Sequence, residues 1–248
     1  MFLAIDADIL AYQAVSSAEF EMDWGGDIWS LSTDLAEAKD IFTQQVETIK
    51  DKTGIKKAVF CFSDHSDNFR KHVYPAYKSG RKKTRKPLGY KALCDWVAEN
   101  EDVMRKPGLE ADDVCGLLST KPENAKQCVV VSSDKDLKTI PGQLYRPMND
   151  EMLSITEQEA DRNFLTQCLT GDSTDGYPGV PGIGPKKAEA VLGLRPHWGA
   201  VEQAYIAAGL TKDDAIQQAR LARILRWSDW DADQGELILW TPPHKSSN

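Results

Sequence analysis

Three short apolar runs, each closely followed by an aspartate, constrain the fold of this 248-residue chain more than any other feature. The runs cover residues 2–5, 57–62 and 128–131, and the aspartates are Asp6, Asp64 and Asp134. Between the first two runs, apolar residues recur every three or four positions from residue 35 to residue 49, which predicts an amphipathic helix. Strands that alternate with helices predict an α/β fold, with a parallel, doubly wound sheet and helices on both of its faces.

The three aspartates are expected at one edge of this sheet. The carboxyl ends of parallel strands lie along the same edge, and folds of this kind bind their ligands there. Asp136, two residues after Asp134, would add a fourth carboxylate. A single aspartate after a strand is usually a turn or cap residue, so it is the recurrence that favours a functional site.

Residues 108–114 contain three further carboxylates, Glu110, Asp112 and Asp113, among apolar neighbours and without a basic residue. At a separation of 5 Å and an effective dielectric constant of 20, each like-charged pair is destabilised by roughly 3 kcal/mol. The three side chains therefore either point into water or hold a cation. Acidic residues are also favoured in the first turn of a helix, and this segment alone leaves both interpretations open.

The segment from Arg70 to Lys91 carries nine Lys and Arg residues and no acid, whereas the rest of the chain has 21 basic and 38 acidic residues. The net charge of -8 alone argues against a nucleic-acid partner, but this distribution indicates a cationic arm on an anionic body. Its Pro and Gly residues predict a loop or broken helices that project from the core. Its cations could contact phosphates, and Phe69, Tyr74 and Tyr77 could stack on bases, although a solvated basic surface is the simpler alternative.

A Gly- and Pro-rich loop follows Asp172 and Asp175 and leads into a basic helix start. Residues 182–185 predict a turn with proline at the first helical position. Backbone N–H groups at such a helix start can bind an anion, and Lys186 and Lys187 would add positive charge. The order is typical of non-specific contact with the DNA backbone, although an ordinary connection between two helices would have the same pattern.

The remaining elements are less informative about function. We expect helices at residues 90–100, 111–118, 157–168 and 197–227, and a hairpin at residues 142–155. The tryptophans of the C-terminal part should pack in a core, and the last polar residues should be disordered. The five scattered cysteines are expected to be buried thiols rather than disulfides or zinc ligands. The N-terminus lacks the basic flank of a signal peptide and no run spans a bilayer, so we expect a cytoplasmic protein without membrane contact.

Taken together, these motifs resemble the 5'-nuclease superfamily: flap endonucleases, the 5'-exonuclease domains of bacterial DNA polymerases, and phage 5'-to-3' exonucleases. The resemblance runs from Asp6 to about residue 190. The segments that carry it are Ile5-Asp6, Phe62-Ser63-Asp64, Tyr77-Lys78-Ser79-Gly80-Arg81, Gly108-Leu109-Glu110-Ala111-Asp112-Asp113-Val114, Ser133-Asp134-Lys135-Asp136-Leu137 and Thr170-Gly171-Asp172-Ser173-Thr174-Asp175. The compact size of the chain and its amino-acid sequence at residues 62–64 and 85–90 are most similar to those of the stand-alone exonucleases of podovirus-type phages.

The resemblance implies a domain organisation. It places a metal-binding α/β nuclease domain with a PIN-like fold at residues 1–160, including a basic helical arch at about 68–91. A helical DNA-binding region follows at residues 161–230, with a helix-three-turn-helix at about 170–195. Residues 231–248 would form a C-terminal tail.

The resemblance also implies two divalent metal ions, Mg²⁺ or Mn²⁺, for which hard oxygen ligands are suited. The carboxylates that match the first metal's shell are Asp6, Asp64, Glu110, Asp112 and Asp113. Asp134 matches a position near both metals. The carboxylates that match the second metal's shell are Asp136, Asp172 and Asp175. Many members have aspartate directly after the phenylalanine of the second motif, where this chain has Ser63, so Asp64 is the expected ligand there. Many also read Ser-Asp-Asn where this chain has Thr174-Asp175-Gly176.

Lys78 and Arg81 match basic residues that contact the scissile phosphate, which implies a catalytic role for both. The implied DNA contacts are Arg70, Lys71, Tyr77, Lys78, Arg81, Lys82, Lys83, Arg85 and Lys86 in the arch, and Gly182, Gly184, Lys186 and Lys187 in the helix-three-turn-helix. In several members the latter motif also binds a monovalent cation, which here would be K⁺.

The implied activity is metal-dependent 5'-to-3' exodeoxyribonuclease action on duplex DNA, by in-line attack of a metal-activated hydroxide. Substrates would be double-stranded DNA with 5' ends, nicks, gaps or flaps, with an RNA–DNA hybrid as a further candidate. Flap endonuclease and RNase H-like activities would suit roles in phage DNA degradation, primer removal and recombination. We expect a monomer, in the host cytoplasm if a phage encodes it.

Two other functions compete with the nuclease hypothesis. A haloacid-dehalogenase-like phosphatase would use Asp6 as nucleophile and Asp8 as acid/base after the first strand, but it leaves Glu110 and the basic segment unexplained. The Asp8 side chain distinguishes the two hypotheses, because the phosphatase needs it and the nuclease hypothesis treats it as dispensable. A non-catalytic DNA-binding relative would keep the arm and lose the chemistry, and the presence of all nine matched carboxylates argues against it.

Overall fold

A six-stranded sheet forms the centre of the computed structural model, which describes residues 1–80 and 85–243. The strand order is β5-β4-β1-β6-β7-β8. The strands are β1 (Phe2–Asp6), β4 (Ala58–Cys61), β5 (Val103–Met104), β6 (Cys128–Val131), β7 (Gly142–Arg146) and β8 (Glu151–Ile155). All neighbours pair in parallel except β8, which returns antiparallel to β7 through the short helix η3 (Pro147–Asn149). The predicted parallel sheet and the hairpin at residues 142–155 are confirmed.

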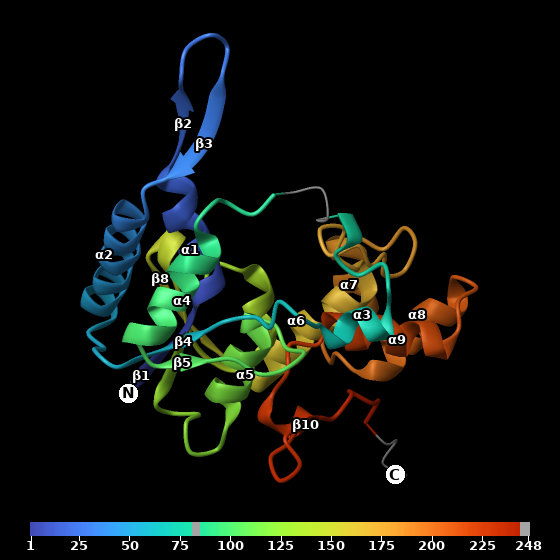
Figure 1. Ribbon diagram of the computed structural model, residues 1–248. Coiled ribbons are helices and arrows are strands. Elements are labelled where there is room, and N and C mark those ends of the chain that lie inside the picture. Colours follow the sequence, from blue (N-terminus) through green and yellow to red (C-terminus); the bar gives the residue numbers. More distant parts are fainter. Residues whose placement is uncertain (81–84, 244–248) are drawn as a thin grey trace.

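Helices cover both faces of the sheet, as predicted (Figure 1). Helices α1 (Ala7–Ser17), α2 (Leu35–Thr53) and α4 (Tyr90–Asn100) pack on one face, and α5 (Ala111–Thr120) packs on the other. Helix α2 is the amphipathic helix expected from the sequence. It begins where the Asp34 side chain accepts hydrogen bonds from the backbone N–H groups of Ala36 and Glu37, and it ends at Gly54 with φ +69°.

Side chains alternate between the two faces along the central strands, as the pleat requires. Leu3, Ile5 and Phe60 belong to the core under α1, α2 and α4, whereas Ala4 and Cys61 belong to the core under α5. The register aligns residue 6 of β1 with residue 61 of β4, and residue 5 with residue 131 of β6. The three central strands therefore end at the same level, which forms the common edge predicted from the sequence.

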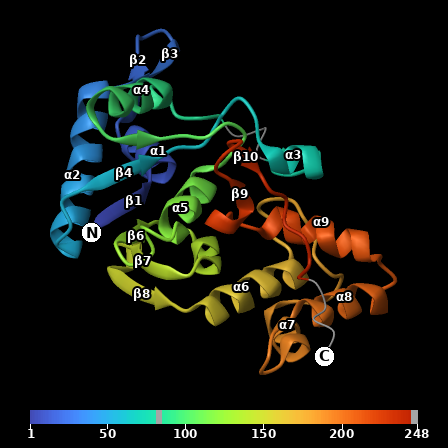
Figure 2. The same cartoon turned by 90° about the horizontal axis from the view of Figure 1, so that it is seen from below.

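A helical region follows the sheet and has a core of its own (Figure 2). It contains α6 (Glu157–Thr170), α7 (Pro185–Leu192), α8 (Trp198–Ala207) and α9 (Lys212–Ala222). The expected single helical stretch at 197–227 is thus two helices, and it ends at residue 222 because the chain turns back onto α5. The predicted domain boundary at residue 160 stays a prediction, since α6 spans it.

Helix α5 packs unusually closely against the segment that follows α9. A Cβ atom on Gly116 would lie 2.2 Å from the backbone oxygen of Leu225, so only glycine permits this approach. The backbone N–H of Leu225 donates to Asp113 Oδ1 at 3.2 Å, and that of Trp227 donates to Thr120 Oγ1 at 2.7 Å. These contacts fix the C-terminal segment on the helix that carries Asp112.

A protruding hairpin, β2 (Glu19–Asp23) and β3 (Trp29–Thr33), was not anticipated from the sequence (Figure 1). Large apolar side chains, among them Trp24, Ile28 and Trp29, are exposed on it, and none of residues 19–33 belongs to the three cores. Arg85 holds its base through two hydrogen bonds to the Glu19 carboxylate, of 2.7 and 2.8 Å.

The basic segment and the C-terminal tail both lie closer to the body than predicted. Helix α3 (Phe69–Val73) packs against α9, and Tyr77 belongs to the helical core, so residues 69–78 do not project. In the tail, β9 (Trp230–Asp231) pairs with β10 (Glu236–Leu237), and the Trp240 ring lies 4.7 Å from that of Trp198. The remaining short helices are η2 (Lys135–Thr139) and η4 (Trp227–Asp229).

No helix within residues 1–80 and 85–243 is long and apolar enough to cross a membrane. All five cysteines lie in these ranges, and each is a free, buried thiol, as the sequence predicted.

Replacing Gly116 with alanine should lower the free energy of unfolding by about 1–3 kcal/mol, because the new Cβ would force α5 away from the backbone at residue 225. Gly184→Ala is the matched control, since a Cβ there meets no atom within 4 Å. Urea unfolding of both variants measures the effect. Equal stabilities would mean that the close approach of α5 is not required by the fold.

Candidate active site

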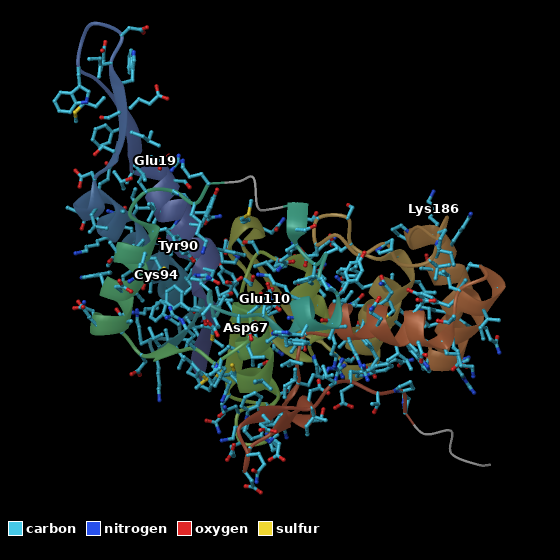
Figure 3. All side chains as sticks on the ribbon, turned by 45° about the vertical axis from the view of Figure 1, so that its right-hand side comes forward. Glu19, Asp67, Tyr90, Cys94, Glu110 and Lys186 are labelled. Atoms are coloured by element: carbon cyan, nitrogen blue, oxygen red, sulfur yellow. The ribbon has the colours of Figure 1, made fainter. Side chains whose placement is uncertain are left out.

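A cavity of about 250 Å³ opens between the carboxyl edge of the sheet and the helical region, and eight carboxylates line it. They are Asp6, Asp8, Glu110, Asp112, Asp134, Asp136, Asp172 and Asp175. Figure 3 shows Glu110 in this position, between the sheet with its helices and the region that bears Lys186. The cations Arg70, Lys78 and Lys135 also reach the cavity, so negative charge predominates.

The carboxylates nearest the sheet repel one another strongly. Burial, Asp8 and Asp134 raise the pKa of Asp6 to about 7, although a 2.9 Å hydrogen bond from the Ser132 hydroxyl opposes the shift. Burial and the charges of Asp6 and Asp134 raise the pKa of Asp112 well above its usual value. A positive charge placed among them would relieve this repulsion.

Glu110 has the opposite environment. Burial alone would raise its pKa, but the charges of Arg70 and Lys78 outweigh burial and hold the pKa at about 2. The Lys78 ammonium group contacts Glu110 Oε1, and Arg70 Nη1 donates to Oε2 at 3.1 Å. The Tyr77 hydroxyl lies 2.9 Å from the same Oε2 and 3.0 Å from Asp175 Oδ2. Glu110 is therefore ionised and held by three neighbours.

A tight loop between α6 and α7 carries the two acids on the opposite side. Asp172 Oδ1 accepts hydrogen bonds from the backbone N–H groups of Thr174 and Asp175, and Lys135 Nζ lies 3.2 Å from Oδ2. The loop closes because Gly171 and Gly179 pack backbone to backbone: a Cβ on either would come within 2.5 Å of the other. This closure turns both acids toward the sheet edge.

The carboxylates are not gathered around a common point. Within the part of the chain that the structure describes, no three acidic, histidine or cysteine side chains are arranged so that they could hold a metal ion as they stand. Lys78 lies against Glu110 and 3.6 Å from Asp175, and Lys135 lies against Asp172. Lysine ammonium groups thus neutralise part of the cavity's charge.

The structure brings seven of the nine predicted ligands to the cavity, but Asp64 is not among them. Its Oδ2 accepts from the backbone N–H of Gly108 at 2.8 Å and its Oδ1 from Ser66, which lowers its pKa to about 2. Ser63 lines the cavity instead, and its Oγ accepts from the backbone N–H of Ala111 at 3.0 Å. The alternation of β4 explains the difference, since Cys61 and Ser63 face α5 and the next residue faces away.

Asp113, the second exception, is 0% exposed and does not line the cavity. Both of its oxygens accept hydrogen bonds from Arg70, at 2.7 and 2.8 Å. Arg70 is itself only 2% exposed, and its predicted contact with DNA stays a prediction. The Tyr77 ring is buried beside Tyr177, and its predicted stacking on a base also stays a prediction.

The other predicted DNA contacts lie at the surface or outside the described residues. Lys71, Lys86, Lys186 and Lys187 are exposed, as are Gly182 and Gly184 in the turn before α7. Arg85 is exposed but bound to Glu19. Arg81, Lys82 and Lys83 lie outside the described residues, so the catalytic role predicted for Arg81 and the projecting part of the arch stay predictions.

The nuclease hypothesis gave no role to four polar residues that line or support the cavity: Asp8, Ser63, Ser132 and Gln167. Asp8 accepts from the backbone N–H of Ser63 at 3.1 Å and from the Tyr90 hydroxyl at 2.8 Å. The position of Ser132 directly after β6, level with Asp6, was a signal that could have found it. Gln167 lies on α6, and nothing in its sequence context marks it.

Comparison with known proteins identifies the family. The model of the protein family described as "5'-3' exonuclease, N-terminal resolvase-like domain" matches residues 2–164. The chain belongs to this family. It is 34% identical to the exonuclease of Escherichia phage T7 over 280 aligned residues, which cover 97% of this chain and 93% of that protein. It is 33% identical to the exodeoxyribonuclease of Enterobacteria phage T3, with 97% and 92% coverage.

Further relatives share part of the sequence or the fold. The flap endonuclease Xni of Shewanella oneidensis is 38% identical over 141 residues, half of this chain and 52% of that protein. The T5 D15 protein co-crystallised with metal ions superposes with a TM-score of 0.65 at 12% identity, over 89% of this chain and 88% of that one. The 5'-nuclease resemblance is thus confirmed, and the family assignment favours the nuclease hypothesis over the phosphatase hypothesis.

Asp64→Ala should lower the free energy of unfolding by about 1–3 kcal/mol, because the Gly108 and Ser66 loops lose their acceptor. The variant should retain nuclease activity, since its carboxylate lies outside the cavity. Asp134→Ala is the contrasting variant, and we expect it to change the stability little and to abolish DNA cleavage. Thermal unfolding and DNA cleavage measure both effects. Loss of cleavage with unchanged stability in Asp64→Ala would restore its predicted role as a ligand.

Proposed function

We propose that the chain is a metal-dependent 5'-to-3' exodeoxyribonuclease that releases nucleotides from the 5' ends of duplex DNA. Its family and its two phage relatives of nearly equal length make it a 5'-3' exonuclease. The single observation that carries the metal-dependent reaction is the cavity with eight carboxylates at the sheet edge. Such a concentration of negative charge suits a cation and repels a phosphodiester unless a cation is present.

Two divalent cations, Mg²⁺ or Mn²⁺, would be held by oxygens from both sides of the cavity. Asp6, Glu110, Asp112 and Asp134 would hold one, and Asp136, Asp172 and Asp175 the other. The donor set fits, because it consists of hard carboxylate oxygens and because the repulsion at Asp6 and Asp112 would be relieved. Such ions supply the charge that activates the attacking water and stabilises the leaving oxygen. A protein of the same fold, T5 D15, was co-crystallised with metal ions.

The residues of the chain bind and orient the DNA. Lys78 reaches the cavity from the basic segment, where its ammonium group can bind the phosphate to be cleaved, and Arg81 would assist it. Exposed Lys186 and Lys187 at the start of α7 would hold the duplex backbone at a distance from the cleavage site (Figure 3). A monovalent cation, K⁺, would lie at the turn formed by residues 182–184.

The substrates we propose are duplexes with 5' ends, nicks, gaps or flaps. The flap structures are supported by the flap endonuclease relative, which matches half of this chain. We also propose that the protein cleaves RNA in an RNA–DNA hybrid. It would act as a monomer, in the cytoplasm of an infected host cell. A non-catalytic DNA-binding relative is the alternative that the experiments must exclude.

The purified chain should release nucleotides from a 5'-labelled duplex only in the presence of Mg²⁺ or Mn²⁺. Asp112→Ala should reduce the rate by at least about 10³-fold, because the carboxylate is central to the cavity, while DNA binding in Ca²⁺ stays nearly unchanged. Fluorescence anisotropy provides the binding measurement. Binding without cleavage of duplex, nicked, gapped and flapped DNA by the wild-type chain would establish the non-catalytic alternative.

Lys186→Ala should weaken binding to DNA of any sequence and reduce the salt dependence, lowering the slope of log K against log [salt] by about 1. Lys57→Ala is the control, because this exposed lysine precedes β4 at the opposite edge of the sheet. Anisotropy titrations between 50 and 200 mM salt, about the range over which phosphate contacts dominate, measure both slopes. Equal slopes for the two variants would remove Lys186 from the DNA contacts.

A further inference from the structure

We propose that Arg70 and Asp113 form a buried positioning pair that orients Glu110 and joins it to the segment after α9. Neither residue then contacts DNA or a metal ion, although both lie in segments that suggest such roles. The inference rests on the proposed function, since it assigns Glu110 to a metal. It concerns residues of this chain and their contacts with one another.

Arg70 uses all five of its N–H donors inside the protein. Its Nε donates to the backbone oxygen of Leu221 at 3.0 Å, and Nη2 donates to that of Arg223 at 2.6 Å. Nη1 donates to Glu110 Oε2 at 3.1 Å and to Asp113 Oδ2 at 2.7 Å, and Nη2 also donates to Asp113 Oδ1 at 2.8 Å. A guanidinium group has no further donor, so none is available to a phosphate.

Asp113 is equally saturated. Its Oδ2 accepts from Arg70 and from the backbone N–H of Glu110 at 3.1 Å, and its Oδ1 accepts from Arg70 and from the backbone N–H of Leu225. A metal ion would have to displace a charged, bidentate partner from a fully buried position. The pair therefore connects three segments: α3 in the basic segment, the first turn of α5, and residues 221–225.

This connection fixes one oxygen of the Glu110 carboxylate. Arg70 and the Tyr77 hydroxyl both contact Oε2, whereas Lys78 contacts Oε1. Both oxygens of Glu110 are thus held by protein groups, and a cation in the cavity would have to replace Lys78 at Oε1. A weaker Arg70–Asp113 pair would let the Glu110 carboxylate rotate and would reduce its affinity for that cation.

A neighbouring pair provides a matched control. Arg223 Nε donates to Asp229 Oδ2 at 2.8 Å, and the same oxygen accepts from the backbone N–H of Arg226 at 2.9 Å. Asp229, like Asp113, is a buried carboxylate bound to an arginine and to a backbone N–H group. Asp229 does not line the cavity and does not contact Glu110. Removing its charge should disturb stability in a similar way without changing the site.

The test compares Asp113→Asn, Arg70→Lys and Asp229→Asn in the full chain. Calorimetric titration with Mn²⁺ in the absence of DNA measures cation affinity, and anisotropy in Ca²⁺ measures DNA affinity. We expect Asp113→Asn and Arg70→Lys to weaken Mn²⁺ binding and to raise the Mg²⁺ concentration for half-maximal cleavage by about tenfold or more. Both should bind DNA within about twofold of the wild type, and Asp229→Asn should match the wild type in cation affinity. If Asp113→Asn does not fold, Arg70→Lys, which keeps the charge beside Asp113, decides the question.

Three results would overturn the inference. Equal loss of Mn²⁺ affinity in Asp229→Asn would make the pair merely structural. Weaker DNA binding by Arg70→Lys, with a smaller salt slope and normal Mn²⁺ affinity, would make Arg70 a DNA contact. Loss of one Mn²⁺ equivalent in Asp113→Asn alone would make Asp113 a ligand. A wild-type chain that neither binds Mn²⁺ nor cleaves DNA would instead contradict the proposed function, which keeps the two failures distinguishable.

Discussion

Repulsion among the carboxylates at the sheet edge is the constraint on which the rest of the structure depends. Aligned strand ends place Asp6 and the residues after β6 at one level, and the closed loop at Gly171 brings two further acids to the same cavity. Charges this close are unfavourable in a partly buried site, as the raised pKa of Asp6 indicates. The fold must therefore bring cations to this place from other parts of the chain.

Those cations come from segments distant in the sequence, and each carboxylate group has a different one. Arg70 neutralises Asp113 inside the protein, Lys78 lies against Glu110, and Lys135 lies against Asp172. For Asp6, by contrast, the causes of the raised pKa include no cationic side chain from the described residues. The uneven distribution separates carboxylates that hold the structure from carboxylates that are left to bind an ion.

The sequence predicted the sheet and most of the site because both follow from local patterns. Apolar runs gave the strands, and their common register placed the acids at one edge. Asp64 does not line the cavity because it lies beyond the strand, where a shift of one residue moves the side chain to the other face, and its role as a ligand stays a prediction. The hairpin of β2 and β3 was missed although polar and apolar residues alternate along both of its strands, a pattern that does predict a strand.

The basic segment shows best why composition alone could not assign roles. Its nine cations look equivalent in the sequence, yet the exposed fraction of the side chain is 3% for Arg70, 19% for Lys78 and 54% for Arg85. The first is a structural counter-ion, the second lies in the cavity, and the third reaches the surface but is bound by Glu19. Counting charges therefore overstates the number of phosphate contacts that the segment can make. Because each cation that neutralises a DNA phosphate releases counterions, the salt dependence of binding should reflect exposed lysines such as Lys71, Lys86 and Lys186, rather than all nine cations of the segment.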